Sequence, residues 1–314
     1  MSPRPWERVL ARRGYALVDG GLATELERRG RDLGTALWSA AVLTDDPAAI
    51  SAVHDDYLEA GADIVISATY QASFEGFAAI GIDHDRARDL MQRAVDLALA
   101  ACRDHGGADE GPLAAASIGP YGAMLADGSE YTGDYGVGEV ELARFHRERL
   151  ALLSASGADL LAIETIPSAA EAAVLAALVD EVDGPAAWLS FSCRDGGRLN
   201  DGSAIGAVVR ELAAVPRIGA FGVNCTHPRF VESLVGEIRD AAPEADVVVY
   251  PNLGEPWNPR TRRFDPASGS EPFDALAERW YRAGARLIGG CCRTTPAHIA
   301  AVGRRLDRVV RQGG

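Results

Sequence analysis

Eight short apolar runs recur along this chain, and longer segments with apolar residues at helical spacing separate them. The runs are YALVDG (15–20), DIVISAT (63–69), LAAASIG (113–119), LLAIET (160–165), AWLSFSC (187–193), AFGVNC (220–225), VVVYPN (247–252) and RLIGGC (286–291). Buried strands that alternate with amphipathic helices are typical of a parallel sheet covered by helices. Eight such units predict an α/β fold, a single-domain (β/α)8 TIM barrel over residues 1–314. A doubly wound open sheet is the alternative.

The charge balance limits the partners of the chain. Lys and Arg together number 31 and Asp and Glu 45, which gives a net charge of −14. This charge repels nucleic acid and anionic membrane surfaces and favours a small or cationic partner. Residues 1–16 precede no apolar segment of the kind found in signal peptides, and no apolar run approaches the length of a membrane span. We therefore expect no nucleic-acid partner, no membrane association and a cytoplasmic location.

The barrel places chemistry in a predictable position, because barrel enzymes carry their active sites on the loops at the carboxyl ends of the strands. Polar and reactive residues do follow the apolar runs: Asp19 and Gly20, Tyr70, Glu164, Asn224 and Cys225, Asn252, and Cys291 and Cys292. Residues remote in sequence are thus expected to converge at one mouth. The segments 119–136 and 254–271 are long enough to act as lids over it.

The five cysteines are expected to be thiols in a reducing compartment. Cys291 and Cys292 are neighbours in sequence and cannot form an unstrained disulfide with each other. With Cys225 they can supply three corners of a tetrahedral zinc site, and the fourth corner stays open. The sequence therefore predicts a Zn²⁺ cofactor held by these three residues.

Other residues compete for this interpretation. Cys102 lies in a helical segment and Cys193 in a strand, and both are expected to fill the core, because buried cysteines behave as small apolar residues. His227 follows Cys225 closely enough to be a rival ligand. Because Pro228 comes next, a cap at the start of a helix is the favoured role for His227.

Several motifs carry a resemblance to a known family: VDGGLATELERRG (18–30), ADIVISATYQASFEGF (62–77), GPYGAMLADGSEYTGDY (119–135), DLLAIETIPS (159–168), GVNC (222–225) and LIGGCCRTTPAHI (287–299). The chain resembles the homocysteine S-methyltransferase family of zinc-dependent barrels. The cysteine pair and the distant cysteine are its specific markers. Residues 119–135 and 289–296 are most similar to bacterial members that use S-methylmethionine or S-adenosylmethionine.

The resemblance implies an enzyme that transfers a methyl group from a sulfonium donor to the thiolate of L-homocysteine, giving methionine. It implies that Cys225, Cys291 and Cys292 hold zinc and that Asp19 and Glu164 hold the homocysteine amino group. A turn-forming Asp-Gly and a carboxylate at a helix start are the structural alternatives for these two acids.

The remaining substrate-binding predictions are less specific. Gly20 and Gly290 would let backbone amides approach the substrate carboxylate. Asn224 would orient the adjacent ligand or simply end its strand. Tyr70 matches a tyrosine that occupies the open metal position in betaine-using relatives, with aromatic packing as its alternative. Trp38 would line the pocket or pack on the following helix.

Donor recognition is predicted for the segment 119–136. Glu130 and Asp134 offer anionic acceptors, and Tyr131 offers an aromatic face that attracts a cation. These groups suit S-methylmethionine, which carries a sulfonium and an amino-acid head. A solvated lid that contacts no substrate is the alternative. Three other functions stay open: a betaine-using homocysteine methyltransferase, a module of a cobalamin-dependent methionine synthase, and a non-catalytic thiol-rich zinc-binding or redox-sensing barrel.

Overall fold

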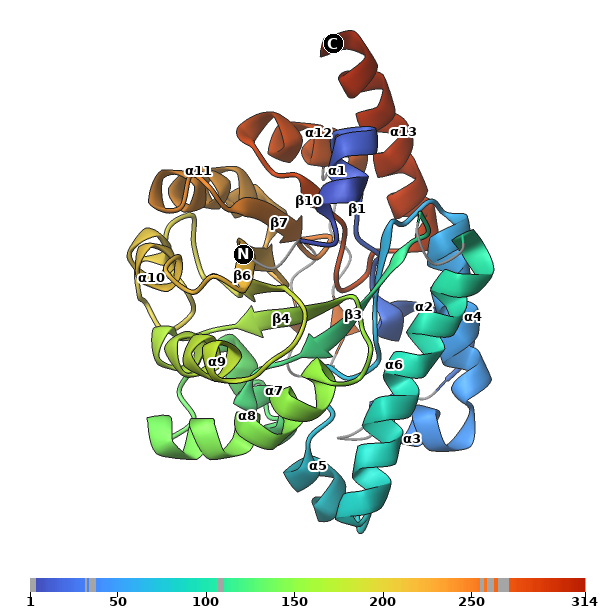
Figure 1. The fold of residues 1–314 in the computed structure, drawn as a ribbon. Helices are drawn as coiled ribbons and strands as arrows, with labels where there is room; N and C mark the ends of the chain where they lie inside the picture. The colour runs from blue at the N-terminus through green and yellow to red at the C-terminus, as the bar shows by residue number, and fades with distance from the viewer. Residues whose placement is uncertain are drawn as a thin grey trace.

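The computed structural model of the chain describes residues 4–31, 33, 38–106, 110–254, 257–258, 263–264 and 271–313. Eight parallel strands form one sheet in the order β1-β10-β7-β6-β5-β4-β3-β2. A parallel bridge from Val18 to Ile64 joins the two ends of this order, so the sheet closes on itself (Figure 1). The strands are β1 (Ala16–Leu17), β2 (Ile64–Ile66), β3 (Leu113–Ile118), β4 (Leu160–Ile166), β5 (Ala187–Phe191), β6 (Ile218–Asn224), β7 (Asp246–Tyr250) and β10 (Leu287–Ile288). The predicted single-domain barrel is confirmed.

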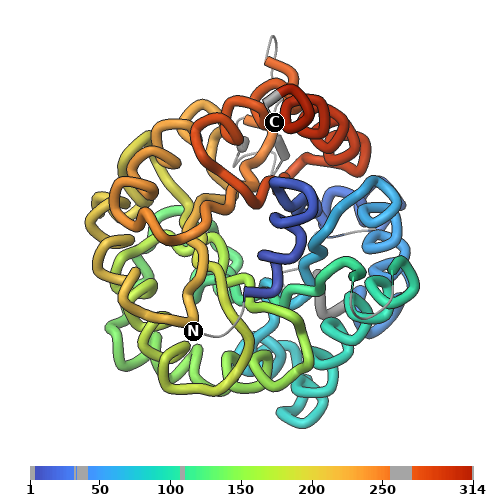
Figure 2. Tube along the Cα trace, turned by 45° about the horizontal axis from the view of Figure 1, so that its top comes forward, coloured from blue at the N-terminus to red at the C-terminus, as the bar shows by residue number. Residues whose placement is uncertain are grey.

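The described helices cover the barrel, most of them in a ring around it and α1 across one end (Figure 2). They are α1 (Glu7–Arg13), α2 (Leu22–Arg28), α3 (Trp38–Asp45), α4 (Pro47–Glu59), α5 (Phe74–Ala79), α6 (His84–Gly106), α7 (Tyr121–Leu125), α8 (Glu139–Ser154), α9 (Ala169–Glu181), α10 (Ile205–Leu212), α11 (Val231–Ala241), α12 (Phe273–Ala283) and α13 (Pro296–Gly313). The 3₁₀ turns are η1 (Ser129–Tyr131) and η2 (Pro228–Phe230), and β8 (Trp257–Asn258) pairs with β9 (Arg263–Phe264). In the described part of the chain, every helix is too short or too polar to cross a membrane.

Local sequence explains where the helices begin. Asp46 accepts a hydrogen bond from the Ala49 backbone and stands directly before Pro47, so a cap and a proline together start α4. Ser168 does the same for α9 through the Glu171 backbone N–H. Most apolar side chains of the helices pack between them and the strands, in the larger of two buried clusters.

The smaller buried cluster fills the inside of the barrel, and α1 closes one end of it. Trp6, directly before α1, is fully buried there and donates from Nε1 to Asp246 at 2.9 Å. Its ring lies 6.4 Å from that of Trp188 in β5. Asp246 begins β7, so the closed end is the amino-terminal end of the strands. Trp6 and α1 thus cover the end of the barrel opposite the loops on which barrel enzymes carry their active sites.

A polar layer lies inside the barrel toward those carboxyl ends. Side chains alternate along a strand, so residues two positions beyond the inward-facing Trp188, Ala162 and Val248 also point inward. These residues are Ser190, Glu164 and Tyr250. Hydrogen bonds show that they meet across strands: Ser190 Oγ lies 2.7 Å from the Tyr250 hydroxyl, and Ser117 donates to Glu164. The interior thus changes from apolar to polar at the mouth.

Candidate metal and substrate site

Three cysteines from two strand ends meet at the mouth. The Sγ of Cys225, directly after β6, lies 3.0 Å from that of Cys291 and 3.5 Å from that of Cys292. The Sγ atoms of Cys291 and Cys292 are 4.0 Å apart. Cys225 has a φ of +46°, a left-handed conformation that turns the chain sharply at the end of β6. We call these three residues the thiol cluster.

The spacing of the thiol cluster fits a metal ion. A tetrahedral zinc with Zn–S bonds of about 2.3 Å holds its sulfur ligands about 3.8 Å apart. The three sulfur separations lie around that value, whereas a disulfide would need about 2.05 Å. All five cysteines are free, and within the described residues this cluster is the group of His, Cys, Asp or Glu side chains arranged to hold a metal. Hydrogen bonds from the other two thiols lower the pKa of Cys292.

The competing cysteine and histidine predictions are also resolved by geometry. Cys102 and Cys193 are buried among apolar side chains of the larger cluster, as expected for core residues. His227 is exposed, and its Nδ1 accepts the Arg229 backbone N–H at 3.2 Å. It caps η2, which confirms the predicted cap role.

Two carboxyl groups are buried beside the cluster. Asp19, two residues after β1, is 3% exposed, and Glu164, in β4, is 7% exposed. Asp19 accepts the Ile66 backbone N–H at 2.8 Å, and Glu164 accepts the Ser117 hydroxyl. Burial raises the pKa of Glu164 to about 7, against the opposing effect of hydrogen bonds from Ser117 and Tyr250. Burial also raises the pKa of Asp19, and the nearby charge of Glu164 adds to that rise.

Neither carboxyl group has a salt bridge to a described arginine or histidine. A buried carboxylate is costly without a cation, so two of them side by side form a place where an ammonium group would bind well. The amino group of an amino-acid substrate supplies such a cation.

The glycines at the ends of β1 and β10 have a role different from the one expected. The Gly290 N–H already donates to the Asp19 carbonyl at 3.0 Å, and the Gly21 N–H donates to Thr294 Oγ1 at 3.2 Å. A Cβ on Gly290 would lie 2.4 Å from Thr294 Oγ1, and one on Gly20 would lie 2.8 Å from the same atom. These glycines therefore let the ends of β1 and β10 pack together. Among the described residues Gly20 keeps a backbone N–H without an intramolecular partner, and it alone of the two predicted glycines remains a candidate amide for a substrate carboxylate.

Asn224 orients its neighbours instead of facing a substrate. It is fully buried, and its Oδ1 accepts the Thr165 backbone N–H at 2.7 Å and the Ser190 hydroxyl at 2.8 Å. Its Nδ2 donates to Thr165 Oγ1 at 2.7 Å. Thr165 has a φ of +63° and directly follows Glu164. Asn224, which directly precedes Cys225, thus ties the end of β6 to the backbone that follows Glu164 in β4.

The segment 119–136, which we call the β3 loop, reaches across the mouth. The Tyr131 hydroxyl lies 3.9 Å from Cys225 Sγ, and Ser192 Oγ donates to the Glu130 carbonyl at 3.5 Å. The Oε2 atom of Glu130 is buried without a hydrogen-bond partner among the described residues. Burial raises the pKa of Glu130, and the nearby Asp127 and Cys292 raise it further. Asp134 is exposed, with its backbone N–H on Thr132 Oγ1 at 3.3 Å.

The two aromatic predictions have different outcomes. Tyr70 is half-buried against Gly119, where an added Cβ would lie 2.7 Å from its ring. Burial and the neighbouring Cys225 thiol raise the pKa of the Tyr70 hydroxyl. Trp38 begins α3, but its side chain lies outside the described residues, as does most of the segment 254–271.

The site is supported by polar residues that were not predicted from the sequence. Close to the carboxylates and Asn224 lie Ser117, Ser190 and Tyr250. The junction of β1 and β10 is held by Thr294 and Tyr57. Period-two alternation along strands β3 and β5 is the signal that predicts Ser117 and Ser190 to point inward. Tyr57 had no such signal, because it lies in α4 and contacts the site through tertiary packing.

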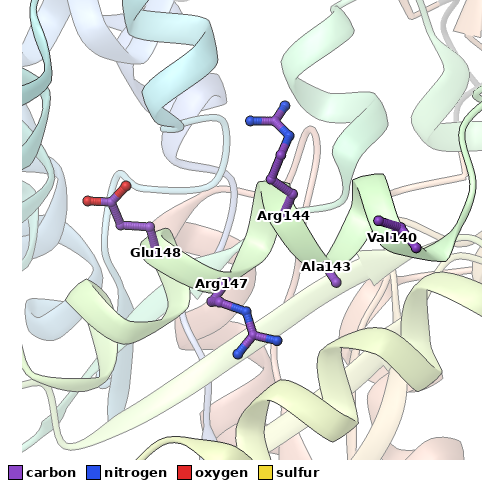
Figure 3. A pocket seen from close by; sticks show the side chains of 5 residues that line it. All are labelled: Val140, Ala143, Arg144, Arg147 and Glu148. Atoms are coloured by element: carbon purple, nitrogen blue, oxygen red, sulfur yellow. The ribbon is translucent and has the colours of Figure 1, made fainter.

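A shallow hollow of about 480 Å³ lies elsewhere, on the outer face of α8 (Figure 3). Its lining residues all belong to that helix: Val140, Ala143, Arg144, Arg147 and Glu148. Val140 is 87% exposed, and Arg144 and Arg147 form ion pairs with Glu75, Glu141 and Glu181. The hollow therefore contributes nothing to the site at the barrel mouth.

Fold and site together define a (β/α)8 barrel with three cysteines that could hold a metal ion at the carboxyl ends of its strands. The family described as homocysteine S-methyltransferase matches residues 16–306. The chain belongs to the homocysteine S-methyltransferase family and is a methyltransferase.

Individual relatives agree with this assignment. The chain is 43% identical over 304 residues to homocysteine S-methyltransferase YbgG of Bacillus subtilis, covering 95% of this chain and 96% of that relative. It is 45% identical over 309 residues to a selenocysteine Se-methyltransferase of Brassica oleracea, covering 93% and 89%. The metallated form of the homocysteine methyltransferase MmuM from Escherichia coli superposes with a TM-score of 0.85 at 40% identity, covering 96% and 100%.

Proposed function

We propose that this chain transfers a methyl group from S-methylmethionine to the thiolate of L-homocysteine, giving methionine. The observation that carries the proposal is the pairing of the thiol cluster with two buried carboxylates that lack a described cationic partner. A zinc store or a redox sensor needs the thiols but has no use for carboxylates aimed at an ammonium group. Residues 1–314 would then form one homocysteine-binding domain, in agreement with the family match over 16–306.

Zinc is the proposed metal, with Cys225, Cys291 and Cys292 as its ligands. Thiolates are soft ligands that select zinc over magnesium or calcium, and three protein ligands leave a position for a substrate. Bound there, zinc would hold the homocysteine sulfur as a thiolate at neutral pH. The free state of all five cysteines supports a reducing location such as the cytoplasm.

The protein groups then orient the acceptor. We assign the homocysteine ammonium to Asp19 and Glu164, and the Gly20 N–H to its carboxylate. With its ammonium held there, the substrate would present its sulfur to the thiol cluster at the mouth. This positioning supplies much of the catalysis, because two reactants held in line gain the equivalent of a high local concentration.

The donor is assigned to the β3 loop. The unpartnered Oε2 of Glu130 offers a hydrogen-bond acceptor for the donor's ammonium group, and the faces of Tyr70 and Tyr131 attract a sulfonium. As the new carbon–sulfur bond forms, the bond from the methyl carbon to the sulfonium sulfur breaks, and that sulfur leaves with the electron pair. S-methylmethionine is thereby converted to a second methionine. The proton lost from the homocysteine thiol passes to solvent before the attack.

Three donors at equal concentration test this proposal. With homocysteine and zinc-loaded protein, we expect the fastest methionine formation from S-methylmethionine and slower formation from S-adenosylmethionine, whose adenosyl group needs extra room. Betaine is expected to be inert, because its quaternary ammonium has no N–H to donate to Glu130. Methionine is quantified by chromatography over time. A betaine rate equal to or above the S-methylmethionine rate would contradict the assignment.

Two carboxylates of the same loop provide a matched pair of variants. Glu130→Gln should raise the KM for S-methylmethionine by about 10-fold, in line with the roughly 1.5–3 kcal/mol of a charged hydrogen bond. Asp134, the second acceptor predicted from the sequence, is exposed, so we leave it out of donor recognition and expect Asp134→Asn to keep this KM within about twofold. An equal effect of both changes, or no effect of either, would remove Glu130 from donor recognition.

A further inference from the structure

Two buried side chains from outer helices hold the β3 loop at both of its ends. Glu171, in α9, accepts the Tyr121 backbone N–H through Oε1 at 2.6 Å and the Tyr135 hydroxyl through Oε2 at 2.9 Å. Arg149, in α8, donates from Nη2 to the Gly119 carbonyl and from Nη1 to the Ala72 carbonyl at 3.0 Å. Glu171 is 0% exposed and Arg149 is 1% exposed. None of the proposed chemistry uses either residue.

A buried histidine joins these two charges. The Nε2 atom of His146 lies 2.8 Å from Glu171 Oε1, and its Nδ1 lies 3.4 Å from Arg149 Nη2. A guanidinium can only donate, so Nδ1 must accept, and the ring proton is on Nε2 and is donated to Glu171. Burial lowers the pKa of His146, which agrees with a neutral ring. The three residues thus carry charges of +1, 0 and −1 and are balanced as a set.

The loop transmits a change at these ends to its middle. Gly122 is packed so closely that an added Cβ would lie 2.5 Å from the Glu130 backbone N and 2.6 Å from the Tyr135 ring. The start, middle and end of the loop are therefore in mutual contact. The middle carries Glu130, and Tyr131 with its hydroxyl 3.9 Å from Cys225 Sγ. Displacement of Tyr121 or Tyr135 moves the groups at the mouth.

Stability alone is a weak explanation for the three residues. Buried ion pairs seldom stabilise a protein more than apolar side chains of the same volume would, because removing the charges from water offsets their attraction. In addition, their outward hydrogen bonds end on the loop and on Ala72, close to Tyr70, instead of on the two helices that carry them. This arrangement fixes the mouth of the barrel.

We propose that Arg149, His146 and Glu171 are positioning residues that fix the β3 loop and thereby determine binding of the methyl donor. The inference rests on the proposed function, in which this loop receives the donor. It adds a set of residues remote from the thiol cluster that act on one of the two substrates. Homocysteine and the metal, which are held by other elements, should be unaffected by them.

Glu171→Gln keeps the shape of the side chain and removes its charge. We expect the KM for S-methylmethionine to rise by about 10-fold to 100-fold, as a misplaced binding group commonly causes. The homocysteine Kd and the zinc content should stay within about twofold of the unchanged protein. Backbone amides of residues 127–134 should exchange hydrogen faster in this variant, because glutamine has one acceptor oxygen where Glu171 uses two, and so it cannot accept from Tyr121 and Tyr135 through separate oxygens. Hydrogen exchange is measured by mass spectrometry and does not depend on turnover.

Histidine variants and a surface pair separate positioning from packing. His146→Gln can accept from Arg149 and donate to Glu171, so it should largely restore the donor KM that His146→Ala raises. Arg147, shown in Figure 3, pairs with Glu181 and so joins the same two helices on the outside. Arg147→Met should change neither the donor KM nor the loop exchange. If Glu171→Gln does not fold, Tyr135→Phe removes one anchor from the loop side.

The outcomes are distinct. The proposal is supported if Glu171→Gln and His146→Ala raise the donor KM and speed loop exchange. His146→Gln should then stay close to the unchanged protein in both measurements. Lower thermal stability with an unchanged donor KM and unchanged loop exchange would overturn it, and so would an Arg147→Met variant that behaves like Glu171→Gln. If the unchanged protein makes no methionine, the proposed function fails, and loop exchange alone then decides whether these residues hold the loop.

Discussion

Serine in place of Cys225, Cys291 or Cys292 is expected to remove the metal and methyl transfer together. The hydroxyl of serine stays protonated at neutral pH and is a poor zinc ligand, so two thiolates would remain where the site needs three. The loss of affinity should exceed the roughly 10-fold to 100-fold typical for removal of a group that only supports a ligand. Zinc per chain is measured by mass spectrometry after dialysis, and methionine formation is measured on the same samples.

The other two cysteines are the controls. Cys102→Ser and Cys193→Ser place a hydroxyl in the core, away from the thiol cluster, so they should lower thermal stability and keep about one zinc per chain. Full zinc occupancy in a Cys291→Ser, Cys292→Ser double variant would contradict the ligand assignment. Equal zinc loss in the Cys102→Ser variant would do the same.

Glu164→Gln is expected to strengthen the fold and weaken homocysteine binding. The pKa of Glu164 is about 7 in the folded protein and near its ordinary value of 4.5 in the unfolded chain. Between these pH values the folded state keeps a proton that the unfolded state has lost, so stability falls as pH rises from 4.5 to 7. At pH 8 the penalty reaches about 3 kcal/mol, and glutamine, which does not ionise, avoids it. Homocysteine loses its charged partner, and its binding weakens by roughly 1.5–3 kcal/mol.

Urea unfolding at pH 5 and pH 8 and calorimetric titration with homocysteine measure both effects. The variant should be nearly as stable as the unchanged protein at pH 5 and more stable at pH 8. Glu181→Gln, at an exposed position, should change the unfolding free energy by less than about 0.5 kcal/mol at either pH. A Glu164→Gln variant that is less stable at pH 8, with an unchanged homocysteine Kd, would assign Glu164 a structural role.

The sequence was sufficient to predict the barrel and the meeting of its reactive residues, because both follow from local pattern. Buried parallel strands appear in the sequence as apolar runs, and in a barrel the carboxyl ends of all eight strands lie around one mouth. Cys225 and Cys291 are 66 positions apart in sequence, yet the topology alone brought their strand ends together. His227 was also predictable, since a proline after it favours a cap.

What the sequence could not provide depends on backbone angles and on contacts between elements. The left-handed φ of Cys225 and of Thr165 has no signal in residue type, since neither residue is glycine. Gly290 was expected to offer its amide to a substrate, but register pairs that amide with Asp19. Glu171 and Arg149 lie on two different helices, and their meeting through His146 is a product of helix packing that no periodicity encodes.

We propose above that the thiol cluster holds a zinc ion that takes up the sulfur of homocysteine. X-ray absorption at the zinc edge can test this claim, because the spectrum reports how many sulfur atoms surround the metal. We predict three sulfur ligands in the zinc-loaded protein and four after homocysteine is added, with all Zn–S distances near 2.3 Å. A sulfur count that stays at three in the presence of saturating homocysteine would contradict the claim.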